Sequence, residues 1–314
     1  MLSRRHIRIK VLHALYSYVQ NESATLAQGE KSLRKSIDDI YRLYLYELRA
    51  LEELRKLAQE KIDRNKKKRL PTPEDLNPAL YFVNNRFLTW LSHHQGYHHL
   101  LEKQHISFYE NREILKKIFN EIEASATYQE YMQSPSQPSL AEDKRLVKWI
   151  YGTFLVTNES LYQFYEEQNM HWADDLDAAQ MMVAKTIKSF SEETTPEKPL
   201  VSLYKDHSDL QFGLELYRKT IQNNDDYTAR IKEKAVNWET ERIAVVDAIL
   251  LKMALAELVA FQEIPVKVTL NEYIELGKEY STPKSSNFIN GILDKLQEEM
   301  KAEGKIKKIG RGLL

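Results

Sequence analysis

Apolar residues recur three and four positions apart along most of the 314-residue chain, and no stretch shows sustained alternation. This spacing is typical of amphipathic helices and predicts an all-α protein. The strongest stripe lies in a long helix expected over residues 30–66, and it consists of Leu43, Tyr44, Leu48, Leu51, Leu54 and Leu57. A solvent-exposed stripe of that size is unusual, so we expect the neighbouring helices within 80–132 to cover it.

Glycine and proline are scarce, with nine of each in the chain, and most prolines mark breaks between the expected helices. These helices occupy parts of about 3–20, 30–66, 80–104, 106–132, 140–168, 174–190, 208–222 and 226–236. The linker SEETTPEKP (191–199) is the best domain boundary. We therefore expect an N-terminal helical bundle over residues 1–190, a C-terminal bundle over 200–304 and a basic, mobile tail over 305–314.

Three well-marked helices are expected near the C-terminus. Asn237 can cap the first, whose first turn holds Glu239 and Glu241 and which runs to about residue 261. Thr269 and Glu272 have capping-box spacing, which predicts the start of the second helix. Ser285 is a plausible cap for the third.

Overall charge does not indicate a polyanionic or membrane partner, because 45 basic and 46 acidic residues give a net charge of −1. The most apolar segment, residues 244–261, is interrupted by Asp247, Lys252 and Glu257, so it predicts a core helix and no membrane span. The chain has no cysteine, which excludes disulfides, cysteine-bound zinc and thiolate catalysis. We expect a soluble, cytoplasmic protein.

The opening segment SRRHIRIKVLHALY (3–16) concentrates positive charge without an acid. It is not a signal peptide, because charged residues interrupt its apolar part. Arg4, Arg5 and Arg8 could bind phosphates while Tyr16 stacks on a base, a combination that suits single-stranded RNA. The alternative is a solvated first turn on a helix that only packs.

Other candidate motifs are weaker. His94, His98 and His105 share a helical face and could ligate a metal, but we favour solvent-facing histidines because no H-E-x-x-H spacing occurs. For the run RNKKKRL (64–70), we favour a solvated helix end over a second RNA contact. The sequence has no phosphate-binding glycine loop, nucleophile elbow, or kinase or hydrolase signature. We therefore expect no enzyme activity, no cofactor and no bound metal.

Two segments at opposite ends of the chain resemble the NusB transcription antitermination family. Residues 237–296 contain a hydrophobic helix with an A-x-E-L element (256–258), followed by IPVKV, NEYIELGK and SSNFINGILDK. The N-terminal RRHIRIKVLHALY is similar to the family's arginine-rich arm. The resemblance implies an all-helical fold of two bundles, binding of boxA-like RNA in ribosomal RNA transcripts, a complex with ribosomal protein NusE, and indirect association with the RNA polymerase elongation complex.

The resemblance also assigns roles to individual residues. It implies RNA contacts at Arg4, Arg5, Arg8, Tyr16, Lys284 and Phe288. It places Asp247 on the helix that faces NusE. Similar domains fused to ribosomal RNA cytosine methyltransferases do not fit, because the nucleophilic cysteine and the α/β domain are absent.

The chain is longer than typical family members, and the excess lies mainly within about 21–140. We expect this insertion to pack as its own helical layer on the N-terminal bundle, away from the arm. The alternative function is a helical protein-interaction scaffold that keeps the NusB fold but has lost RNA binding.

Overall fold

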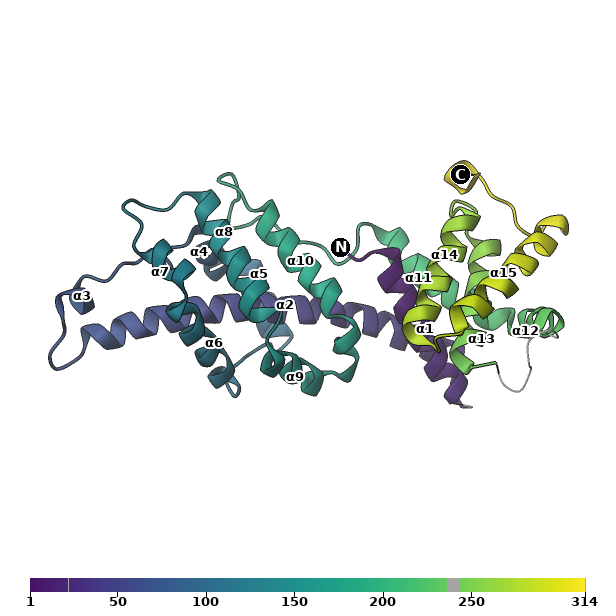
Figure 1. Cartoon of the computed structure of the whole chain (residues 1–314), viewed down its shortest axis with the longest axis horizontal. Coiled ribbons are helices and arrows are strands. Elements are labelled where there is room, and N and C mark those ends of the chain that lie inside the picture. Colours follow the sequence, from purple (N-terminus) through teal and green to yellow (C-terminus); the bar gives the residue numbers. More distant parts are fainter. Residues whose placement is uncertain (22, 236–242, 314) are drawn as a thin grey trace. The chain divides into compact units, whose positions relative to one another are not determined.

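The computed structural model describes residues 1–21, 23–235 and 243–313, and Figure 1 shows their arrangement as helices joined by loops. The described residues contain no β-strand, which confirms the all-α prediction. The chain forms two compact units. We call Asp38–Leu203, with Met1, the middle unit, and Leu2–Ile37 with Tyr204–Leu314 the terminal unit.

The middle unit is built on most of the long helix α2, which begins within the terminal unit. Its described helices are α2 (Leu26–Lys66), α3 (Pro73–Leu76), α4 (Arg86–His93), α5 (Gln95–Lys103), α6 (Arg112–Ala124), α7 (Ala126–Met132), α8 (Leu140–Ile150), α9 (Glu159–Gln168) and α10 (Leu176–Ser189). A π-helical turn (Tyr151–Leu155) follows α8, and a 3-10 turn (Met170–Asp174) follows α9.

The predicted stripe of α2 is buried along its whole length, from Leu43 to Leu57. The segments packed on α2 include the one that we expected, since Tyr46, which lies beside the stripe, packs edge-on against Phe108 at 5.7 Å between ring centroids. They also extend beyond that segment, because Tyr44 hydrogen-bonds Thr186 at 2.7 Å. The added helices thus bury the stripe together with the chain up to α10.

One buried carboxylate stands out in the middle unit. Glu47 of α2 lies among apolar side chains, and burial raises its pKa to about 7. The hydroxyls of Tyr151 and Tyr165 are close enough to oppose part of that rise. Burial disfavours the charged form of a carboxyl group, so Glu47 holds its proton to a much higher pH than an exposed glutamate.

The terminal unit surrounds one apolar helix. Its helices are α1 (Arg4–Gln20), α11 (His207–Gln222), α12 (Asn224–Lys234), α13 (Val245–Ala260), α14 (Val266–Tyr280) and α15 (Ser285–Ala302). Helix α13 packs against α1, α11, α12, α14 and α15. The structure therefore confirms that the most apolar segment is a core helix, and no described helix is long and apolar enough to cross a membrane.

The division into units differs from the expected bundles at 1–190 and 200–304. Residues 2–37 belong with the C-terminal helices, because the apolar stripe of Ile7, Val11 and Leu15 is buried and α1 packs on α11 and α13. An apolar stripe indicates that a helix packs against another element, but it does not identify that element.

Helix starts near the C-terminus also differ from the expected ones. The proposed cap Asn237 and the acids Glu239 and Glu241 lie outside the described residues. Helix α14 begins at Val266, nearly one turn before Thr269. The capping-box spacing of Thr269 and Glu272 therefore predicted the wrong helix start. Thr269 is buried and its hydroxyl donates to Glu257 at 2.9 Å, so this residue takes part in the core and does not cap a helix.

Candidate nucleic-acid interface

The start of α1 is anchored by a buried ion pair between Arg8 and Glu257 of α13. Two parallel hydrogen bonds of 2.8 Å join the guanidinium to the carboxylate, and the side chains are 3% and 0% exposed. Burial alone would lower the pKa of Arg8, but the Glu257 carboxylate outweighs it and raises that pKa above its usual value. Paired, charge-assisted hydrogen bonds of this kind are strong, and each buried ion offsets the desolvation of the other.

Both carboxylate oxygens of Glu257 also accept hydrogen bonds from α14. Thr269 and Tyr273 of α14 donate to its two oxygens at 2.9 and 3.0 Å. Burial and the neighbouring Glu257 raise the pKa of Tyr273 well above its usual value, so its hydroxyl stays a donor. Three helices therefore meet at one carboxylate, and Arg8 is part of the core.

This geometry changes the role of Arg8 among the expected RNA contacts. The guanidinium of Arg8 is 3% exposed and forms two hydrogen bonds with a carboxylate, so it is not accessible to a phosphate. Arg8 instead positions the helix that carries the other cations. A sequence signal exists for this role, because Arg8 extends the apolar stripe of α1 and Glu257 is one of three charged residues in an apolar helix.

The first turn of α1 presents Arg4 and Arg5. Arg4 is exposed, with its guanidinium carbon 5.0 Å from the ring centroid of Phe212. Arg5 forms an ion pair with Glu279 of α14 at 3.0 Å, in which both side chains are partly exposed. Such exposed pairs contribute about 1 kcal/mol or less, so a phosphate can compete for Arg5.

Tyr16 lies at the other end of α1 and is 43% exposed. It shares a sector of the helix with Arg5, but Ile9 and Leu12 between them are buried. The helical rise separates the two residues by about 16 Å along the axis. Arg5 and Tyr16 are therefore two separate contact points, and α1 offers no continuous exposed strip between them.

The loop between α14 and α15 is held against α1. The rings of His13 and Tyr280 pack edge-on at 5.6 Å, one residue after the Arg5–Glu279 pair. Lys284 follows this contact and is exposed, while Phe288 in the first turn of α15 is half-buried. The structure thus brings the arm and the expected loop residues into one region of the terminal unit.

Asp247 does not lie on an exposed surface. It is 5% exposed and accepts a 2.8 Å hydrogen bond from the hydroxyl of Ser285. That hydroxyl in turn accepts the backbone N–H of Thr282 at 3.1 Å. Asp247 therefore helps to hold the α14–α15 loop from within, and its expected role on the partner-facing helix stays a prediction. Ser285 begins α15 and takes part in this network, while Lys284 stands at the cap position.

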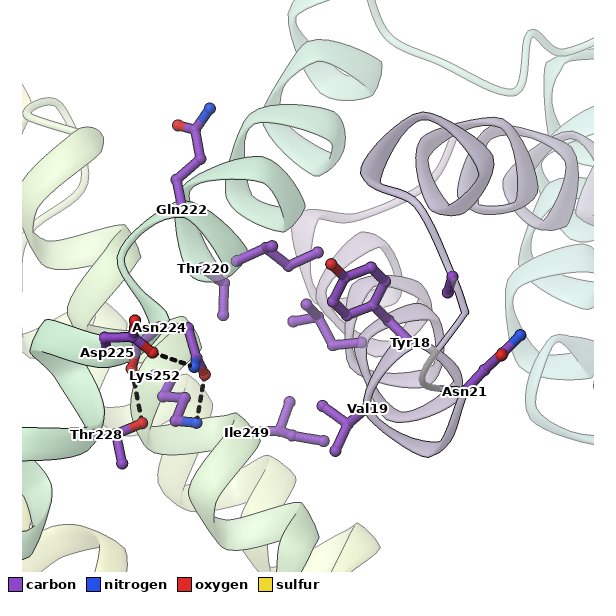
Figure 2. Close-up of a pocket in the computed structure, with 13 residues that line it drawn as sticks. Tyr18, Val19, Asn21, Thr220, Gln222, Asn224, Asp225, Thr228, Ile249 and Lys252 are labelled. Carbon is purple, nitrogen blue, oxygen red and sulfur yellow. Dashed lines mark hydrogen bonds between the residues drawn. The ribbon is translucent and has the colours of Figure 1, made fainter.

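A cleft of about 600 Å³ opens beside the end of α1 and was not predicted from the sequence. Figure 2 shows Tyr18 and Val19 on one side and Asn224, Asp225 and Lys252 on the other. Lys252 donates to the Asn224 side chain at 2.6 Å, and burial lowers its pKa. Apolar and oppositely charged groups share this lining, which suits a protein segment better than a phosphate chain.

The histidine motif of the middle unit has a different arrangement from the expected one. His94 is buried and caps α5, where it accepts the Tyr97 N–H at 3.0 Å. His98 lies within α5, and His105 follows its end with a positive φ of 53°. The three residues therefore do not share one solvent-facing helical face. Within the described ranges, no group of three histidine or acidic side chains is arranged to hold a metal ion.

Part of the chain is similar to known proteins. The model of the NusB family matches residues 170–298. The chain is 41% identical over 114 residues to the transcription antitermination protein NusB of Salinibacter ruber, covering 36% of this chain and 71% of that protein. It is 44% identical over 103 residues to the protein of the same name from Chloroherpeton thalassium, covering 33% of this chain and 49% of that protein.

No solved structure matches the chain. The fold and the site define a class of all-α proteins in which a basic first helix is anchored on an apolar core helix. The chain belongs to the NusB family.

Proposed function

We propose that this protein is a transcription antitermination factor whose terminal unit binds boxA-like RNA of ribosomal transcripts, together with NusE. The observation that carries the proposal is the exposed pair of cations in the first turn of α1, a turn without an acid. A basic helix start and an exposed aromatic ring about 16 Å further along the same helix together suit single-stranded RNA. The family membership and the names of the two relatives support the same function.

In this proposal each group has a separate task. Arg4 and Arg5 bind phosphates, and Arg5 exchanges Glu279 for the RNA. Tyr16 stacks on a base, and Lys284 adds a phosphate contact from the α14–α15 loop. Phe288, half-buried in the first turn of α15, supplies an apolar contact to a base. Arg8 takes no part in contact and holds α1 in place through Glu257.

The proposed NusE complex and the indirect association with the elongation complex follow from the family resemblance. Because the side chain of Asp247 is buried, we propose a different, exposed surface for the partner contact. The cleft beside Tyr18 and Lys252 is the candidate surface, because it combines apolar and charged lining residues. Substituting Val19, which is exposed in that cleft, by aspartate should weaken co-purification with NusE while leaving RNA affinity unchanged.

The RNA part of the proposal is tested by salt-dependent binding. In the variant Arg4→Ala/Arg5→Ala, the slope of log K against log salt should fall by about 1.4, since each lost contact to a single strand accounts for about 0.7. Lys185→Ala/Lys232→Ala is the matched control, because both lysines are exposed on helices outside the proposed site. Equal slopes and affinities for the arm variant and the unmodified protein would favour the scaffold function instead.

A further inference from the structure

The C-terminal tail after α15 carries four cations and no acid within residues 305–313. We expected it to be mobile, but it folds back onto the loop between α13 and α14 (Figure 1). The Ile309 N–H donates to the Gln262 carbonyl at 3.1 Å, and the Lys308 ammonium donates to the Phe261 carbonyl at 3.0 Å. Ile306 is buried. The tail is therefore a docked part of the terminal unit.

A glycine makes the docking possible. Gly312 is buried, and a Cβ atom at this position would lie 1.9 Å from the Gln262 carbonyl oxygen. No side chain fits at that distance, because the obstructing atom is a backbone oxygen, which cannot rotate away as a flexible side chain could. The close approach of tail and loop thus depends on the residue type at position 312.

The tail docks next to the arm. The ring of Phe261 lies 4.8 Å from that of Phe212, and Arg4 stacks on Phe212 at 5.0 Å. Lys308 bonds the Phe261 carbonyl and is near enough to Glu257 to be influenced by its charge. A short series of contacts therefore runs from Arg4 through two rings to the tail, all within the terminal unit.

Three of the four cations of the docked tail face solvent, whereas Lys308 is half-buried. Ile306 points inward, and the flanking Lys305 and Lys307 are exposed, as the two-residue alternation of an extended segment requires. These two lysines are about 6.6 Å apart along the chain at 3.3 Å per residue. Arg311 is also exposed, whereas Lys305 shares an exposed ion pair with Glu303. Because the segment is already held, binding costs less conformational entropy than for a free tail.

We propose that the docked tail is a second phosphate-binding segment, which extends the RNA surface from Arg4 across the α13–α14 loop. The inference rests on the proposed RNA-binding function and adds the path that the strand takes beyond the arm. Lys307 and Arg311 are the contact residues. Lys308 is a positioning residue, because its ammonium is committed to the Phe261 carbonyl.

The test uses the full chain and a boxA-like single-stranded RNA. In Lys307→Ala/Arg311→Ala, the salt slope should fall by about 1.4, which corresponds to about 25-fold weaker binding at 0.1 M salt if the affinities at 1 M agree. Lys185→Ala/Lys232→Ala should keep the original slope. An RNA shortened from either end until it spans the arm alone should bind the tail variant and the unmodified protein equally.

The outcomes separate this inference from the function on which it rests. An unchanged slope for the tail variant, with a reduced slope for Arg4→Ala/Arg5→Ala, would overturn the role of the tail and leave RNA binding by the arm intact. Unchanged slopes for both variants would overturn the proposed function as well. Weakened NusE co-purification with normal RNA binding would overturn the inference in favour of a protein contact at the tail.

Discussion

Replacement of Arg8 by methionine should destabilise the terminal unit without removing an RNA contact. The variant keeps much of the apolar stem but leaves the Glu257 carboxylate at 0% exposure without its counter-ion. Removing one partner of a buried pair typically costs about 3–5 kcal/mol. Thr269 and Tyr273 still donate to the carboxylate, so we expect the lower end of that range.

The remaining charge makes this loss depend on pH. Without Arg8, burial should raise the pKa of Glu257 in the folded variant above its unfolded value. The folded state then binds the extra proton between these two pKa values, so the free energy of unfolding should fall as pH rises through that window. Glu257→Gln in the same chain should remove this dependence and recover part of the stability, because the amide oxygen can still accept one hydrogen bond.

Hydrogen exchange at the amides of α13 is the suitable assay, because it reports the terminal unit separately from the middle unit. Protection should fall in Arg8→Met, recover partly in Arg8→Met/Glu257→Gln, and remain unchanged in Arg5→Met. The salt slope of RNA binding by the folded fraction should stay unchanged in Arg8→Met and fall in Arg5→Met. Full protection together with a reduced salt slope in Arg8→Met would refute the assignment of Arg8 to the core.

Three further predictions concern other buried groups. Glu47→Gln should stabilise the middle unit above pH 7 by up to about 3.5 kcal/mol and have little effect below pH 4.5, because burial raises the pKa of Glu47 from 4.5 to about 7 and each pKa unit is worth about 1.4 kcal/mol; urea unfolding followed across pH would show no such difference if Glu47 were ionised throughout. Asp247→Lys should reduce the melting temperature, since it places a cation against the buried hydroxyl of Ser285, whereas a folded variant deficient only in partner binding would contradict the buried assignment. Gly312→Ala should detach the tail through its clash with the Gln262 carbonyl, and faster exchange of the residue 309 amide would reveal it; unchanged protection there would argue against tight docking.

The sequence alone determined the helical class, the buried stripe of α2 and the core position of α13. These features depend on periodicity and on the length of apolar runs, which are local properties of the chain. The cationic start of α1 was also visible, since charge density needs no knowledge of the fold. Periodicity for α2 and a long apolar run for α13 show that these helices are buried, and neither property requires knowledge of the packing partner.

Tertiary structure alone decided which cations are free to bind. Arg5 and Arg8 are one turn apart and look equivalent in sequence, yet one meets the exposed Glu279 and the other the buried Glu257, 249 residues away. Thr269 and the tail were misjudged for the same reason, and the burial of Asp247 was not visible in the sequence either. The availability of a polar group depends on the atoms packed against it, and those atoms come from segments whose proximity no local pattern encodes.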